Sequence, residues 1–187
     1  MSASRILFDG LKCGRKAGSE HNEVWESLRG VRSTYGDAMG DSTDTSGPRV
    51  AVVPCAECGT LNRIQLNRLG DGPKCARCRH PIALDQPFPV SDAGFDRIVT
   101  GTAEPVLVDF FADWCGPCHA MAPALDAFAR TRAGKVIVLK LDTDANPIMA
   151  TRFGIRSIPT LISFQGGKEW RRHVGAGNLT VLNGLVA

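Results

Sequence analysis

Hydrophobic and polar positions in the second half of the chain alternate between strand-like and helix-like patterns. Residues 105–112 are a nearly continuous apolar run, typical of a strand buried on both faces. Residues 117–130 place Met121, Leu125 and Phe128 on one side of a helix. We expect the other elements to be a strand at 136–142, a short helix at 147–153, a hairpin at 160–174 turning at 165–168, and a helix at 178–186. Strands alternating with helices predict an α/β domain with a mixed sheet.

The first 48 residues show no sustained periodicity. Their last part, 37–48, has the composition of a solvated linker, so we expect this tail to be mostly disordered. A short helix over 23–31 is compatible with the spacing of its apolar residues. Met39 offers another interpretation, in which residues 1–38 are a start-site artefact. We predict three segments: a tail at 1–48, a small cysteine-containing module at 49–86 and the α/β domain at 88–187.

Composition narrows the class of protein. The chain has 187 residues, 43% hydrophobic and 22% charged, and a formal charge of +3, too mild to argue for nucleic acid. No apolar run reaches the length of a membrane span, and the N-terminus has neither the apolar core of a signal peptide nor the acid-poor composition of a transit peptide. Six of the seven cysteines form Cys-x-x-Cys pairs, and Cys13 has no partner. We expect a reducing compartment, the cytoplasm.

The pair Cys115 and Cys118 follows the buried strand and opens a helix. Pro117 suits a first helical turn. Free backbone N–H groups and the helix dipole would stabilise a thiolate at Cys115, and Cys118 lies within disulfide reach, one turn deeper. The pair therefore predicts thiol–disulfide exchange, with Cys115 attacking a substrate disulfide and Cys118 resolving the mixed disulfide. The alternatives are half of a metal site or two idle thiols.

The other two pairs have the spacing of a four-cysteine zinc site. Cys55 and Cys58 are separated from Cys75 and Cys78 by 16 residues, which can form a small hairpin between two chelating turns. A closed shell of four thiolates predicts one structural zinc ion, and its binding would supply the folding energy of the module. Two structural disulfides, or a redox switch that releases zinc, are the alternatives. The module is mildly basic, but no aromatic residue lies between the ligands, so we do not expect nucleic-acid binding.

The stretch 113–123, Asp-Trp-Cys-Gly-Pro-Cys-His-Ala-Met-Ala-Pro, resembles the active-site signature of the thioredoxin family. The resemblance extends through Val-Asp-Phe-Phe-Ala at 108–112, Phe-Gly-Ile-Arg-Ser-Ile-Pro-Thr-Leu at 153–161, and Val-Gly-Ala at 174–176. It implies the thioredoxin fold, a central mixed sheet flanked by helices, over about residues 88–187. With the cysteine module in front, the chain resembles the zinc-containing thioredoxin 2 type, although the tail and a short C-terminal helix depart from that type.

An acid in a buried strand stands out on physical grounds. Asp109 should have a raised pKa because burial disfavours its charged form, which makes it a candidate proton acceptor for Cys118. The alternative is an aspartate at a strand end, held by backbone N–H groups. The resemblance implies the same proton-accepting role, and it implies that Lys140 tunes the acid. Lys140 could instead only extend to the surface.

The resemblance also implies a substrate groove. It predicts a cis peptide before Pro159, in a groove bordered by Trp114, Ile158 and Gly175, where a missing side chain admits a substrate backbone. Gly116 and Pro117 complete the substrate-binding set that we predict. Trp114 as simple packing is the alternative.

We expect a cytoplasmic, monomeric protein-disulfide reductase with one zinc ion and no organic cofactor. Its partners would be disulfide-containing proteins and, from the family, an NADPH-dependent thioredoxin reductase. The competing functions are a zinc-ribbon interaction protein without turnover and a disulfide-forming oxidant. The Gly-Pro dipeptide between the two cysteines favours a low reduction potential, near the value of about −270 mV known for thioredoxin.

Overall fold

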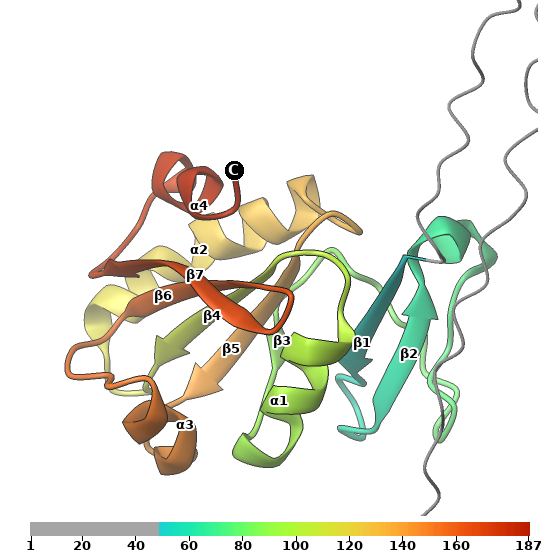
Figure 1. Cartoon of the computed structure of the whole chain (residues 1–187), viewed down its shortest axis with the longest axis horizontal. Coiled ribbons are helices and arrows are strands. Elements are labelled where there is room, and N and C mark those ends of the chain that lie inside the picture. Colours follow the sequence, from blue (N-terminus) through green and yellow to red (C-terminus); the bar gives the residue numbers. More distant parts are fainter. Residues whose placement is uncertain (1–48) are drawn as a thin grey trace, which may run out of the picture. The chain divides into compact units, whose positions relative to one another are not determined.

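The computed structural model describes residues 49–187, in which a two-stranded ribbon precedes a five-stranded mixed sheet with helices on both faces (Figure 1). The predictions for residues 1–48, including the tail, the helix at 23–31, Cys13 and Met39, lie outside the described residues. In chain order the elements are β1 (Val50–Pro54), β2 (Leu61–Gln65), the 3-10 helix η1 (Leu66–Asp71), β3 (Phe88–Pro89), α1 (Asp92–Gly101), β4 (Val106–Phe111), α2 (Gly116–Thr131), β5 (Ile137–Asp142), α3 (Pro147–Arg152), β6 (Thr160–Gln165), β7 (Lys168–Val174) and α4 (Leu179–Leu185).

The large sheet has the strand order β3-β5-β4-β6-β7. β4 is its central strand, parallel to β5 and antiparallel to β6, and all its residues except the last are buried. This agrees with the apolar run that predicted a strand covered on both faces. The predicted strands, the hairpin and the helices of the second half are all present, with ends shifted by one or two residues.

Alternate residues of β4 face two different layers. Leu107 joins the apolar cluster formed with α2 and α4, whereas Val108 and Phe110 join the cluster formed with α1 and α3. Figure 1 shows α2 and α4 on one side of the sheet and α1 and α3 on the other. Since side chains alternate along a strand, Asp109 and Phe111 lie on the same face as Leu107, the face that α2 covers.

Helix α1 and strand β3 were not predicted from the sequence. The buried side of α1 carries only Phe95, Ile98 and Val99, because the helix is short and contains two glycines. Strand β3 has two residues and pairs with β5. Neither element carries enough periodic apolar positions to stand out as a pattern. None of the helices in the described range is long and apolar enough to cross a membrane.

The ribbon differs from the hairpin that we expected between the two cysteine pairs. Strand β2 does follow the first two cysteines, but its partner is β1, the antiparallel strand that precedes them. The 3-10 helix η1 then leads to the second two cysteines. This pairing buries Ala51, Val53 and Ile64 in the same apolar cluster as Phe95 of α1. The ribbon therefore shares a core with the sheet domain.

Backbone and side-chain hydrogen bonds continue this junction. The Ala103 N–H donates to the Val50 carbonyl at 2.8 Å, and the Val52 N–H donates to the Thr102 hydroxyl at 3.1 Å. These two hydrogen bonds connect strand β1 to Thr102 and Ala103, the residues directly after α1.

Candidate active site and metal centre

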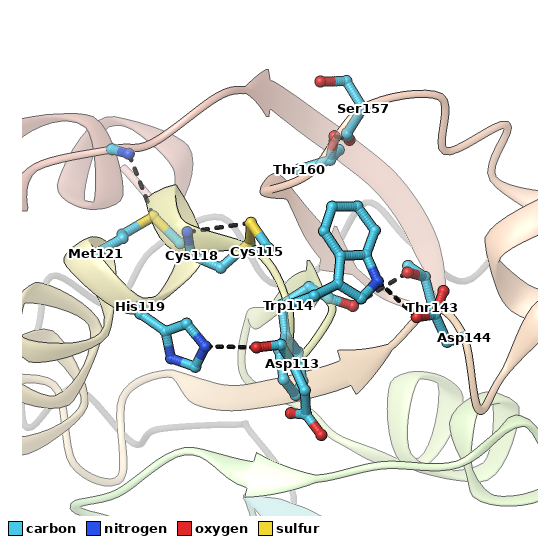
Figure 2. Close-up of a disulfide and its surroundings, with 12 residues drawn as sticks. Asp113, Trp114, Cys115, Cys118, His119, Met121, Thr143, Asp144, Ser157 and Thr160 are labelled. Carbon is cyan, nitrogen blue, oxygen red and sulfur yellow. Dashed lines mark hydrogen bonds between the residues drawn. A yellow bond between two sulfur atoms is a disulfide. The ribbon is translucent and has the colours of Figure 1, made fainter.

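Cys115 and Cys118 lie at the junction of β4 and α2, as predicted (Figure 2). They form a disulfide with their Cα atoms 5.3 Å apart. Cys115 is the N-cap residue of α2, and Pro117 stands in the first helical turn. The Cys118 N–H donates to Cys115 Sγ at 3.2 Å. The helix N-terminus therefore directs a free N–H group at Cys115, which stabilises a thiolate there.

Burial does not distinguish the two cysteines in this disulfide form. Cys115 is 3% exposed and Cys118 is 5% exposed, so the expectation that Cys118 lies deeper is not met. Their surroundings differ instead. Cys118 is on the buried side of α2 with Met121 and Leu125, which pack against Leu107 of β4. It therefore faces the side of the sheet that carries Asp109.

Asp109 lies within β4 and not at a strand end. It is 2% exposed, and its Oδ1 atom has no hydrogen-bond partner among the described residues. Burial raises its pKa from the ordinary 3.8 to about 7, against the opposing effect of the Lys140 charge. The alternative of an aspartate held by backbone N–H groups is therefore not supported at this oxygen.

Lys140 is the direct neighbour of Asp109 on β5. Its side chain does not simply extend into water, because Nζ lies 4.2 Å from the centre of the Phe111 ring. The structure thus brings the acid and the lysine together, as the resemblance implied, and adds an aromatic ring to them.

Two of the predicted groove residues, Pro159 and Gly175, are joined by their backbones. The Ile158–Pro159 peptide is cis, as expected. The Gly175 N–H donates to the Pro159 carbonyl at 2.8 Å, and Gly175 has a φ of +101°, which favours glycine. Gly116 and Pro117 are exposed beside the disulfide.

Trp114, next to Cys115 in the chain, is 72% exposed. Together with Ser157 and Ile158 it lines a hollow of about 380 Å³, and Figure 2 shows the indole facing the Ser157 loop. So large an exposed surface does not fit the alternative of simple packing.

Two contacts around the motif were missed by sequence reasoning. The Trp114 indole N–H donates to Asp144 Oδ2 at 2.8 Å, and His119 Nε2 lies 2.6 Å from the Asp113 carbonyl oxygen (Figure 2). The first fixes the exposed ring, and the second fixes the loop before Cys115. Asp144 is 30 positions from Trp114, so no local pattern could have indicated the pair.

The four remaining cysteines of the described chain form one cluster. Their sulfur atoms all lie within 4.8 Å of one another, and the Cys55–Cys78 and Cys58–Cys75 sulfur pairs are each 3.6 Å apart. None of the four is in a disulfide. Tetrahedral zinc with Zn–S bonds of about 2.3 Å requires sulfur atoms about 3.8 Å apart. The donor set therefore fits a tetrahedral metal ion, and the structural-disulfide alternative is not supported.

Two equivalent turns build this cluster. The Gly59 N–H donates to the Cys55 carbonyl and the Arg79 N–H to the Cys75 carbonyl, and both donor residues have a positive φ, +67° and +65°. In the second turn, the backbone N–H groups of Cys78 and Arg77 lower the pKa of the Cys75 thiol to about 6 against the effect of burial. Such N–H groups favour the thiolate form that binds metal.

Asn62 of β2 joins the two turns and was also missed. It is 8% exposed, and its Nδ2 group donates to the Thr60 carbonyl at 2.7 Å and to Cys75 Sγ at 3.7 Å. Its Oδ1 accepts the Ala76 N–H at 2.9 Å. Burial of Asn62 is known only from the fold, and Cys75 is 13 positions away, so no local pattern could have indicated this contact.

Comparison with known proteins agrees with this geometry. A family model described as thioredoxin matches residues 86–187, and one described as the N-terminal region of thioredoxin 2 matches residues 54–80. A thioredoxin of Synechocystis sp. is 52% identical over 93 residues, covering 50% of this chain and 87% of that protein. The bifunctional thioredoxin reductase/thioredoxin of Mycobacterium leprae is 48% identical over 97 residues, covering 51% of this chain and 21% of that protein.

A solved structure gives the same result for the fold. A point-mutant thioredoxin of Halobacterium salinarum superimposes with a TM-score of 0.52 at 32% identity, covering 56% of this chain and 91% of that one. The predicted fold, a mixed sheet flanked by helices, is confirmed. The chain belongs to the thioredoxin family of protein-disulfide oxidoreductases and carries the N-terminal region of the thioredoxin 2 type ahead of its thioredoxin domain.

Proposed function

We propose that the chain reduces protein disulfides with Cys115 as the nucleophile and Cys118 as the resolving residue. The Cys115 thiolate attacks one substrate sulfur, forms a mixed disulfide and expels the other substrate sulfur as a thiolate. Cys118, after losing its proton, attacks Cys115 Sγ, which restores the Cys115–Cys118 disulfide and releases the reduced substrate. The observation that carries this order is the Cys118 N–H directed at Cys115 Sγ at the start of α2.

Asp109 is the proposed proton acceptor for Cys118. Its pKa of about 7 suits a base that works near neutral pH. Lys140, its neighbour on β5, is the proposed tuning residue because its positive charge favours the carboxylate.

The substrate backbone is proposed to lie across the exposed surface around the disulfide. In this proposal Trp114, Gly116 and Pro117 contact the substrate from one side, and Ile158, Pro159 and Gly175 contact it from the other. The exposed indole and the missing side chain at Gly175 favour an extended apolar peptide segment.

The metal that we propose is one structural zinc ion held by four thiolates, from Cys55, Cys58, Cys75 and Cys78. Four protein ligands leave no open position, so the ion would supply stability and no reaction step. The polypeptide contributes the two turns and the Asn62 bridge that hold the sulfur atoms together.

The proposed partners are disulfide-containing proteins and an NADPH-dependent thioredoxin reductase that returns two electrons to the Cys115–Cys118 disulfide. Support comes from the Mycobacterium leprae relative, whose name joins a thioredoxin reductase to a thioredoxin. We propose a cytoplasmic location because thiolate ligands need a reducing compartment. A monomer without an organic cofactor completes the proposal.

Reduction of insulin by dithiothreitol tests the reductase. Wild-type protein should accelerate it, and Cys115→Ser should abolish the acceleration. Cys118→Ser should trap a mixed disulfide with insulin through Cys115, visible by mass spectrometry. Equal rates for the wild type and Cys115→Ser would leave only a binding role for the thioredoxin domain.

Metal analysis of the reduced protein tests the zinc site. About one zinc ion per chain is expected, as for four ligands in one closed shell. The Cys55→Ser/Cys75→Ser variant should lose the ion and still reduce insulin. Reduced wild-type protein without metal would refute the zinc proposal and leave the reductase proposal untouched.

A further inference from the structure

The Lys140 ammonium lies over the Phe111 ring, on the face of the sheet where Asp109 lies. Lys140 Nζ is 4.2 Å from the Phe111 ring centre, inside the range of about 6 Å for a cation–π contact. Phe111 follows Asp109 by two positions on β4, so the two side chains share a face. Lys140 is the neighbour of Asp109 on β5. The acid, the ring and the ammonium form one cluster.

The ammonium acts on the acid without touching it. Among the described residues, no salt bridge within 4.0 Å joins Lys140 to Asp109. The charge of Lys140 nevertheless lowers the pKa of Asp109 against the effect of burial. A charge–charge interaction over a distance longer than a salt bridge explains both the missing ion pair and the effect of Lys140 on the pKa of Asp109.

This longer distance suits a proton acceptor. A carboxylate in a close ion pair keeps a low pKa and is a weak base, whereas burial alone would keep the acid protonated. A base works best when its pKa lies near the working pH. The position of the ammonium therefore matters as much as its presence.

The surroundings leave the ammonium another position. Phe111, Lys140 and Asp142 line an open hollow of about 330 Å³, so water can solvate the ammonium there. The neighbour of Asp109 on β6, Leu161, carries no charge, and Cys118, on the buried side of α2, is held in the disulfide and does not titrate. Without the ring, the ammonium would move outward towards water and the Asp142 carboxylate, away from Asp109.

We propose that Phe111 is a positioning residue of the redox site, whose ring fixes the distance between the Lys140 ammonium and the Asp109 carboxyl group. The functional part of this inference rests on the proposed role of Asp109 as proton acceptor.

Carbon-13 NMR of the Asp109 carboxyl group, followed against pH in the oxidised full chain, tests the proposal directly. In Phe111→Leu the pKa of Asp109 should rise measurably, because the ammonium moves away and lowers that pKa less. Lys140→Met should raise it at least as far. Phe111→Tyr keeps the ring and should leave the pKa at its wild-type value. Phe111→Met, similar in size to the native residue, serves in place of leucine if that variant does not fold.

The double variant Phe111→Leu/Lys140→Met separates positioning from packing. If the ring acts through the ammonium, the pKa of Asp109 in the double variant equals that in Lys140→Met. A further rise in the double variant, or an unchanged or lowered pKa in Phe111→Leu, would overturn the proposal. Failure of the Asp109 base itself would show separately, as an unaltered pH dependence of mixed-disulfide resolution in Asp109→Asn.

Discussion

Asp109 shows how burial gives a single residue its chemical use. The carboxyl group lies within an apolar strand, and the Oδ1 atom has no partner among the described residues. Burial makes its charged form costly, which raises the pKa to about 7 and makes the carboxylate a stronger base than an exposed aspartate. The same cost must appear in the stability of the protein.

Asp109 should make the protein less stable as pH rises. The unfolded chain releases this proton near the ordinary pKa of 3.8, whereas the folded chain keeps it until about pH 7. Between these values the folded state binds more protons, so the free energy of unfolding falls as pH rises and levels off above pH 7. In Asp109→Asn this contribution disappears, and the variant should be more stable than the wild type at pH 8, by on the order of a few kcal/mol. Urea unfolding of both proteins at several pH values measures this difference in the free energy of unfolding.

An exposed acid on α2 provides the control. Asp126→Asn should keep the wild-type decline of stability between pH 4 and pH 7, because Asp126 is exposed. If Asp109→Asn declines with pH as steeply as Asp126→Asn does, then Asp109 is not protonated in the folded protein near neutral pH.

The sequence predicted the functional role of a residue whose type is unusual for its element. It did not predict the role of a residue that depends on a partner far along the chain. Asp109 stands out in an apolar strand, and Pro159 stands out at the start of a strand. Asp144 and Asn62 are ordinary polar residues in the sequence. Their roles depend on Trp114, 30 positions away, and on Cys75, 13 positions away, which only the fold brings near.

At the scale of elements, the metal cluster depends on how two turns are held together. Cys55–Gly59 and Cys75–Arg79 have matching backbone hydrogen bonds, and Asn62 connects them from β2. The cysteine spacing predicted the ligands but not this bridge. It also did not predict the pairing of β2 with β1, because strands of five residues carry too few alternating positions.

Asn62→Ala should weaken metal binding without removing a ligand. The substitution removes the donor to Cys75 Sγ and leaves the Ala76 N–H without its acceptor. Loss of a residue that orients ligands typically lowers metal affinity by about 10- to 100-fold. Competition with a chromogenic chelator measures the affinity. Gln65→Ala, an exposed change on the same strand, should bind zinc like the wild type. Equal affinities in the two variants would show that the bridge is not needed.

For the molecule as described, the ribbon and the thioredoxin domain are parts of one core. Apolar residues of β1 and β2 belong to the cluster that contains α1, β4 and β6, and hydrogen bonds tie β1 to Thr102 and Ala103. The sequence indicated two separate modules because the cysteine motif and the α/β pattern are adjacent but independent signals. The packing of the ribbon against the thioredoxin domain leaves no motif or periodicity in the sequence. We therefore expect the described part of the chain to unfold in one cooperative step, with metal removal lowering the stability of the thioredoxin domain as well.

Two glycines of α1 test this shared core. A Cβ atom at Gly101 would lie 2.8 Å from Val52 Cγ2, so Gly101→Ala should push β1 away from α1 and destabilise the whole unit by about 1–3 kcal/mol. A Cβ atom at Gly94 meets nothing closer than 3.8 Å, so Gly94→Ala should stabilise the helix by up to about 1 kcal/mol. Thermal unfolding followed by circular dichroism and by zinc release compares them. In Gly101→Ala both signals should shift together to lower temperature. Zinc release that shifts while the thioredoxin domain keeps its wild-type transition would mean that the two parts unfold independently.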